Sequence, residues 1–163
     1  MRFWAVAPHL IDAPKGLGGV WREAATAFSI LAGEKAGGSY AKHAQLTRFR
    51  ETGQPAEALV SYLETIYRQA GALGYSYRWP DRYRARWLPE PVCTVAPVGQ
   101  IVFELALLAQ KTAMRASPEL SRTLRTASLH VAACPADVQI FVSPTVRVDV
   151  TDMRKAHWER MSL

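Results

Sequence analysis

A glutamate next to an arginine is the first pair of side chains in this sequence that could do chemistry. Trp21, Arg22 and Glu23 lie in a stretch whose apolar residues recur at helical spacing. A positioned carboxylate can transfer protons during catalysis. An ordinary ion pair on a helix surface gives the same pattern, and from these residues alone we favour that simpler interpretation.

Arginines and aromatic residues alternate between residues 75 and 87, in the stretch YSYRWPDRYRARW. Such arginines can contact phosphates, and such rings can stack on unpaired bases. In the alternative interpretation the rings pack on the protein body and the arginines are solvated. Both interpretations stay open, and the residues that the first assigns to DNA are Arg78, Arg82, Arg84 and Arg86.

The charge of the chain also suggests a nucleic-acid partner. The formal net charge is +6 over 163 residues, and the basic side chains are fifteen arginines and five lysines. Arginine is suited to bidentate phosphate contacts and to stacking, so a basic domain of this size fits nucleic acid. A solvated surface rich in arginine is the alternative.

Motifs for metal or nucleotide chemistry are absent from the sequence. It has no P-loop, GxGxxG, HExxH or GxSxG pattern, and the two cysteines, Cys93 and Cys134, cannot form a four-ligand zinc site. We expect both cysteines to be buried thiols. The four histidines lack metal-ligand spacing, so we expect neither a metal site nor an organic cofactor; they are His9, His43, His130 and His157.

Hydrophobic periodicity predicts a mainly α protein, a single compact domain over residues 1–163. We expect three principal helices near residues 17–32, 55–74 and 99–115, the third almost apolar on all sides and therefore central. Further expectations are a short extended arm at residues 1–6, a mixed segment at 40–49, a long loop at 75–91, another helical stretch at 118–126 and one or two short strands within 138–150.

Several broad classes are excluded or disfavoured. No apolar run is long enough for a membrane span, and the first twenty residues lack the continuous apolar core of a signal peptide. We therefore expect a cytoplasmic, nucleoid-associated protein. Nothing indicates a heptad repeat or a broad exposed apolar face, so we expect a monomer.

Scattered motifs resemble the pyrimidine-dimer DNA glycosylase/abasic-site lyase family. They include the start MRFW, the stretch VWRE at residues 20–23, Gly74-Tyr75, VGQ at 98–100 and the closing Trp158-Glu159-Arg160. The combination of MRxW with a distant WRE is fairly specific, although each piece alone is weak. The resemblance covers a family-like core over 1–116 and leaves 117–163 as a divergent C-terminal region.

The resemblance implies excision of a damaged base, most simply a UV pyrimidine dimer in double-stranded DNA, without a cofactor. The nucleophile would be the α-amine of Met1, which forms a Schiff base before β-elimination breaks the strand. Glu23 would assist proton transfers and Arg22 would share the site. It matches Lys111 and Arg115 to basic helix positions that face DNA phosphates, and Arg2 to a basic residue just behind the N-terminus. We expect the same DNA-binding surface to include Lys15, Lys42, His43 and Arg48.

The sequence departs from the phage pattern of this family at four points. Arg2 is too bulky for methionine removal, so Met1 itself would supply the amine. A family histidine falls at Gly16, a family arginine falls at Thr26, and the aromatic tail is missing. Two alternatives follow: a glycosylase of the same family for another damaged base, and a DNA-binding module without catalysis.

Overall fold

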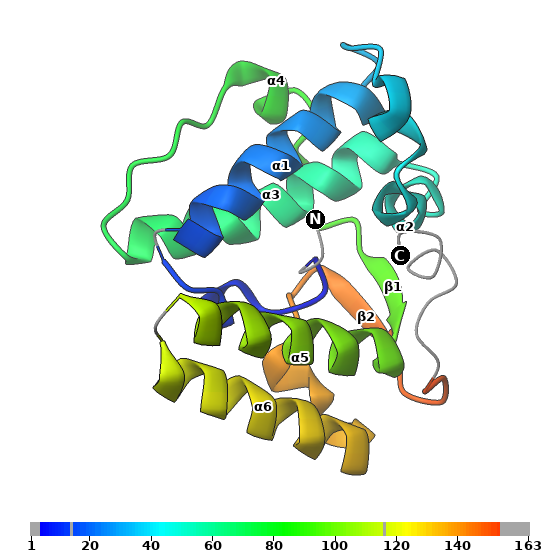
Figure 1. The fold of residues 1–163 in the computed structure, drawn as a ribbon. Helices are drawn as coiled ribbons and strands as arrows, with labels where there is room; N and C mark the ends of the chain where they lie inside the picture. Colours follow the sequence, from blue (N-terminus) through cyan, green and yellow to red (C-terminus); the bar gives the residue numbers. More distant parts are fainter. Residues whose placement is uncertain (1–3, 14, 116, 154–163) are drawn as a thin grey trace.

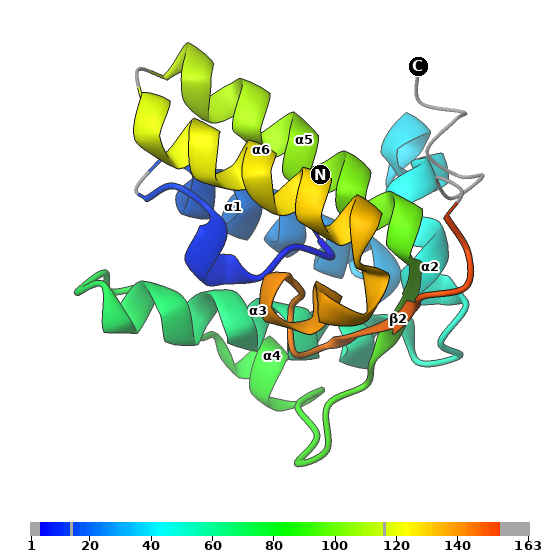
Figure 2. The ribbon, with the colours of Figure 1, turned by 90° about the horizontal axis from the view of Figure 1, so that it is seen from below.

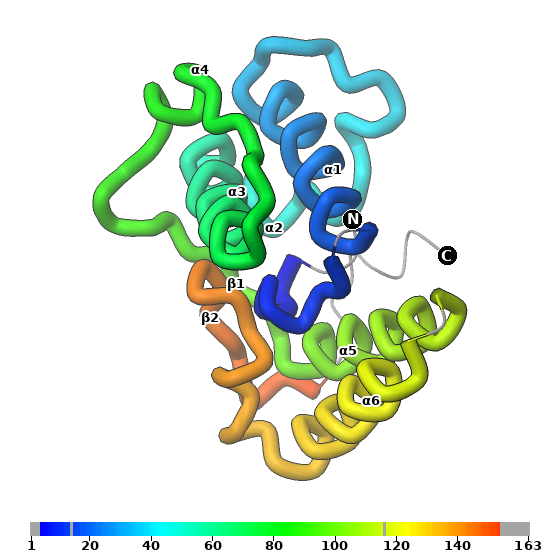
Figure 3. Tube along the Cα trace, turned by 90° about the vertical axis from the view of Figure 1, so that its left-hand side faces the viewer, coloured from blue at the N-terminus to red at the C-terminus, as the bar shows by residue number. Residues whose placement is uncertain are grey.

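Four long helices form two pairs with the N-terminal arm between them. The computed structural model describes residues 4–13, 15–115 and 117–153. Helices α1 (Lys15–Leu31) and α3 (Pro55–Ala72) pack side by side, as do α5 (Val98–Met114) and α6 (Pro118–Ala133). Figures 1 and 3 show residues 4–11 running between the two pairs. The mainly α fold predicted from the sequence is confirmed.

Shorter elements complete the described chain. The short α-helices are α2 (Thr47–Arg50) and α4 (Asp81–Arg84), and the 3-10 helices are η1 (Pro8–Leu10), η2 (Gly38–Lys42), η3 (Ala44–Leu46) and η4 (Pro135–Phe141). Strand β1 (Thr94–Pro97) pairs in parallel with β2 (Val146–Asp149), with Thr94 opposite Val146. Figure 2 shows η4 lying between α6 and α3.

Prolines and one glycine mark where the long helices begin and end. Pro55 and Pro118 occupy first turns, where the missing N–H costs nothing. After α3, Gly74 adopts a φ of 81°, and Tyr75 N donates to Ala70 O over 2.8 Å. This positive φ is ordinary for glycine and strained for other residues, so Gly74 reverses the chain into the loop that follows.

The N-terminal arm is part of the core. Trp4, Ala5 and Val6 are at most 1% exposed. Ser143 N donates to Ala5 O over 2.9 Å, and Ala5 N donates to Glu104 of α5 over 3.0 Å. The first described residues are thereby fixed both to α5 and to the C-terminal segment.

Some local expectations need correction. Strand β1 was not predicted. The expectation of one or two short strands within 138–150 is confirmed by β2, although the first part of that segment belongs to η4. Helix α6 continues beyond the expected end at residue 126, because Ser128 Oγ bonds to Val102 O of α5 and Val131 is buried. Both cysteines are free thiols, but Cys93 is half-buried and Cys134 is exposed, so the expectation of two buried thiols is wrong. No helix among the described residues is long and apolar enough to cross a membrane.

A candidate catalytic pocket between helices α1 and α5

A small charged pocket lies between the first half of α1 and the second half of α5. It encloses about 190 Å³. Its lining contains one glutamate, one aspartate and three cationic side chains among glycines and aliphatic residues: Ile11, Asp12, Lys15, Gly16, Gly19, Val20, Glu23, Leu108, Lys111 and Arg115. The structure therefore brings together four residues that the sequence assigned to catalysis or DNA binding, namely Lys15, Glu23, Lys111 and Arg115.

Glu23 is one of the two carboxylate residues that line this pocket, the other being Asp12. Its helical neighbours Val20 and Ala24 are buried and hold α1 on the core, whereas Glu23 itself is exposed. The negative charge of Glu23 also affects the pKa values of two tyrosines, Tyr40 and Tyr62. Burial raises the pKa of Tyr40, and the nearby Glu23 carboxylate raises it further. Burial likewise raises the pKa of Tyr62, with smaller contributions from Glu104 and Glu23 in the same direction.

Asp12 and Arg115 form a fixed wall of the pocket. Arg115 Nη1 donates to both carboxylate oxygens of Asp12, over 2.6 and 2.8 Å. Asp12 O also accepts from Gly16 N over 2.8 Å, which ties the pair to the first turn of α1. Asp12 compensates the charge of Arg115, and Lys15 and Lys111 are the other two cationic residues of the pocket lining. Asp12 is the pocket residue that the sequence analysis missed.

Two glycines shape the entrance along α1. A Cβ atom at Gly16 would clash with Asp12 Oδ1 and lie 2.9 Å from Ile11 Cγ2, whereas a Cβ at Gly19 would meet nothing within 4 Å. The family histidine expected near Gly16 therefore has no space here while Asp12 binds Arg115. Gly19 leaves open space at the pocket wall, where a large ligand can come close to the backbone.

Arg22 lies outside the pocket lining, on an exposed side of α1. There the guanidinium lowers the pKa of Tyr77, against the upward shift that burial and Tyr75 cause. Trp21 packs with Tyr77 at a centroid distance of 5.1 Å, and Trp79 packs with Tyr83 at 5.3 Å. The inner rings of the segment 75–87 thus pack on the protein body.

Three arginines of the same segment have carboxylate partners. Arg82 binds Glu34 over 2.9 Å and also contacts Ser29 and the ring of Phe28; Arg86 binds Glu57 over 2.9 Å. Arg84 lies 3.5 Å from Asp81. These pairs favour the second interpretation of the segment, in which it packs on the body. Arg78 is exposed.

Arg48 requires a correction, because its side chain does not reach the surface. It is 1% exposed and lies against the fully buried Glu104, with Nη2 to Oε1 at 3.4 Å. Gln100 Nε2 donates to the same carboxylate over 2.9 Å. A side chain enclosed in this way cannot contact a phosphate on the protein surface. The helical spacing of α5 places Glu104 one turn before Leu108, on the same face of the helix.

The remaining predicted residues lie apart from the pocket or outside the described chain. Lys42 is exposed at the end of η2, and His43 Nδ1 accepts a bond from Gln45 N over 3.2 Å. Met1 and Arg2 lie outside the described residues. A larger cavity of about 710 Å³ lies between η1, α3 and η4. It contains none of the predicted site residues, so the smaller charged pocket is the better candidate.

Comparison with protein families gives one match. A family model described as pyrimidine dimer DNA glycosylase matches residues 1–82, half of the chain. No curated protein and no solved structure matches. The matched part contains α1 with Lys15 and Glu23, whereas α5 with Lys111 and Arg115 lies beyond it.

Proposed function

Because the chain belongs to the pyrimidine dimer DNA glycosylase family, we propose that it excises damaged pyrimidines from duplex DNA and then cleaves the strand at the abasic site. The observation that carries this proposal is the pocket whose lining contains Glu23 together with Lys15, Lys111 and Arg115. A carboxylate among cationic side chains suits a reaction that passes through a cation beside a phosphate backbone.

The nucleophile in this proposal is the α-amine of Met1. An α-amine has a pKa of about 7.7–8.0, so a useful fraction is neutral near pH 7, unlike the amine of lysine. Positive charges of Arg2 and Arg22 would favour the neutral form further. The amine lone pair attacks C1′ as the bond to the damaged base breaks, and the base leaves with that bond's electron pair and takes up one amine proton. The sugar ring then opens, O4′ takes up a proton delivered through Glu23, and a cationic imine remains at C1′. Removal of a C2′ proton then expels the 3′-phosphate.

Tether length supports this role for Met1. Ala5 is bonded to Glu104, and Leu108 of the pocket lies one turn further along α5, about 6 Å by helix geometry. The four residues that lead back from Ala5 to Met1 can span at most about 13 Å. This span exceeds the helical rise from Glu104 to Leu108, so chain length is compatible with the N-terminal amine as the nucleophile of this pocket.

Glu23 would hold the cationic imine and move protons. Its test is Glu23→Gln, which keeps the shape and removes the charge. We expect nicking of UV-irradiated duplex to fall by about 10²–10⁴-fold, with affinity for the same duplex largely kept. Equal losses of nicking and affinity would assign Glu23 to binding instead.

A second candidate is excision of a different damaged base by the same chemistry. Asp12 occupies the space that a side chain at Gly16 would need, and Thr26 replaces a family arginine, so recognition can differ. Nicking assays on duplexes with single defined lesions separate the two candidates. Activity on an oxidised or alkylated base and none on a cyclobutane dimer would favour the second.

A further inference from the structure

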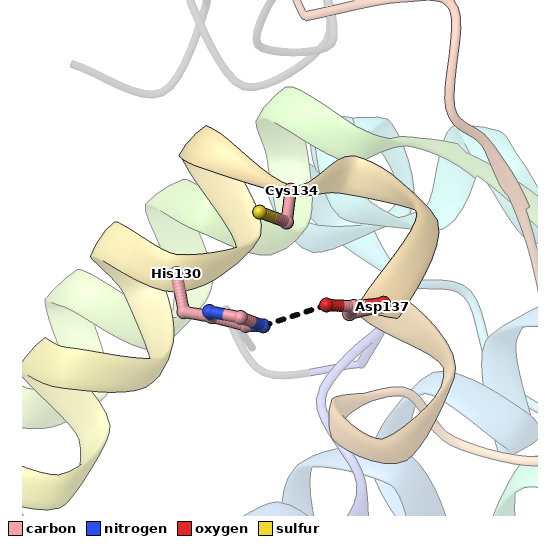
Figure 4. A group of neighbouring side chains, drawn as sticks. All are labelled: His130, Cys134 and Asp137. Atoms are coloured by element: carbon pink, nitrogen blue, oxygen red, sulfur yellow. Dashed lines mark hydrogen bonds and ion pairs between the residues drawn. The ribbon is translucent and has the colours of Figure 1, made fainter.

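Three potential metal ligands meet at the C-terminal end of α6, far along the chain from the pocket residues of α1. His130 lies in the last turn of α6, Cys134 caps that helix, and Asp137 lies in η4. Figure 4 shows the three side chains on the same side of the turn. Their ligand atoms all lie within 4.8 Å of one another, and all three residues are exposed.

The local backbone explains this convergence. His130 and Cys134 are four residues apart, which places them on one face of the helix. Cys134 N donates to His130 O over 2.7 Å, and Asp137 N donates to Cys134 O over 3.1 Å. Pro135 ends the α-helix because it lacks an N–H, and the following 3-10 turn returns Asp137 to His130. The spacing of histidines in the sequence did not predict this cluster.

We propose that His130, Cys134 and Asp137 bind one divalent transition-metal ion of the zinc type. An imidazole nitrogen, a thiolate and a carboxylate are the donors that zinc takes in proteins, at about 2.0–2.3 Å each. Calcium and magnesium prefer sites made entirely of oxygen atoms, and the soft thiolate selects against them. The partial negative charge at the end of α6 also attracts a cation.

The distances require only small movements of side chains. His130 Nε2 lies 2.9 Å from Asp137 Oδ2, and two ligands of a tetrahedral zinc ion lie roughly 3.5 Å apart at those bond lengths. The metal ion takes the place of the hydrogen bond between His130 Nε2 and Asp137 Oδ2, the neutral imidazole binds it through Nε2 and carries its proton on Nδ1, and the Cys134 thiol releases its proton to solvent. Water fills the fourth position. Binding therefore weakens as the pH falls.

The metal ion would fasten two parts of the fold together. Val131 of α6 and Val138 of η4 are both fully buried, on either side of the ligand turn. A metal ion that binds the folded chain more tightly than the unfolded chain stabilises the folded state, and the stabilisation grows with the difference in affinity. The role is structural, and it is independent of the proposed function because none of the three ligands lines the pocket.

The first test is titration of the reduced, metal-free full chain with zinc chloride in competition with a chromophoric chelator. We expect one zinc ion per chain. Loss of a residue that only hydrogen-bonds to a metal ligand lowers metal affinity by roughly 10- to 100-fold. Cys134→Ser and His130→Ala each remove a ligand itself, so each should lower the affinity for zinc by more than that. Cys93→Ser is the matched control, because Cys93 is the other thiol and lies outside the cluster; it should bind like the wild type.

A second measurement separates a built site from general surface binding. Cobalt(II) in place of zinc should give a thiolate-to-cobalt charge-transfer band, absent in Cys134→Ser and present in Cys93→Ser. Zinc should also raise the melting temperature of the wild type and not that of Cys134→Ser. No zinc binding to the wild type, or stoichiometric binding that persists unweakened in Cys134→Ser, would overturn the proposal.

Discussion

The buried ion pair of Arg48 and Glu104 gives the sharpest stability prediction. Glu104 is fully buried, and its carboxylate accepts bonds from Ala5 N over 3.0 Å, Gln100 Nε2 over 2.9 Å and Arg48 Nη2 over 3.4 Å. Glu104→Leu leaves the guanidinium of Arg48 in the core without this counter-charge. Removing one partner of a buried pair costs about 3–5 kcal/mol.

For a chain of this size, each kcal/mol shifts the melting temperature by about 2–4 °C. Glu104→Leu should therefore lower the melting temperature by about 6–20 °C. The double variant Arg48→Met/Glu104→Leu removes both charges and should be more stable than Glu104→Leu alone, because no buried charge is left behind. It should stay about 1–3 kcal/mol below the wild type, because Ala5 N loses its acceptor.

The assays are thermal and urea denaturation of the wild type, both single variants and the double variant, each followed by circular dichroism. Glu34→Ala is the matched control, because it breaks the exposed pair with Arg82 and should cost less than about 1 kcal/mol. Additive effects of Arg48→Met and Glu104→Leu would refute the coupling inferred from the structure. A small effect of Glu104→Leu alone would refute the assigned burial cost.

Three further predictions concern the pocket and the core. Gly16→Ala should destabilise the protein, because the added Cβ forces Asp12 away from Arg115. This loss should exceed the gain from the higher helix propensity of alanine, which is worth about 1 kcal/mol. Higher thermal stability of the variant would contradict the close contact between residue 16 and Asp12. Lys111→Ala should lower the slope of log affinity for DNA against log salt by about 1, because Lys111 lines the pocket. Arg86→Ala, at a residue outside the pocket lining, should change that slope less; the reverse order in a fluorescence-anisotropy salt series would argue against the pocket as the DNA-facing side. Burial raises the pKa of Tyr62 above its usual 10.0, so above pH 10 the unfolded chain releases the proton first and stability should fall by up to about 1.4 kcal/mol per pH unit. Tyr62→Phe should flatten that fall in denaturation curves between pH 9 and 11, and an unchanged slope would count against the burial.

Helical periodicity allowed much of the fold to be predicted from the sequence. The long helices α1, α3 and α5 stand close to their expected positions because each has a continuous apolar face and a proline or glycine at a boundary. Strand β1 could not be predicted, because its four residues form a strand only by pairing with β2, about fifty residues later in the chain. Local patterns carry no information on such long-range pairing.

The candidate site was predictable in its residue types but not in its arrangement. Glu23 was singled out by its neighbours and by the family resemblance. The pairing of Asp12 with Arg115 joins residues from opposite ends of the described core and leaves no local signal. Arg48 looked like a surface cation, since charged residues are usually exposed, and only the packing around Glu104 places it inside.

The central proposal is most directly tested by borohydride trapping with peptide mapping. The wild-type chain, with its intact and unblocked Met1 verified by mass, would be incubated with a UV-irradiated duplex and with an abasic duplex. Reduction should fix a covalent adduct on the Met1 α-amine with both substrates, and acetylation of that amine should abolish both adducts. An adduct on Lys15 or Lys111, or no adduct with either duplex, would contradict the N-terminal amine as the nucleophile.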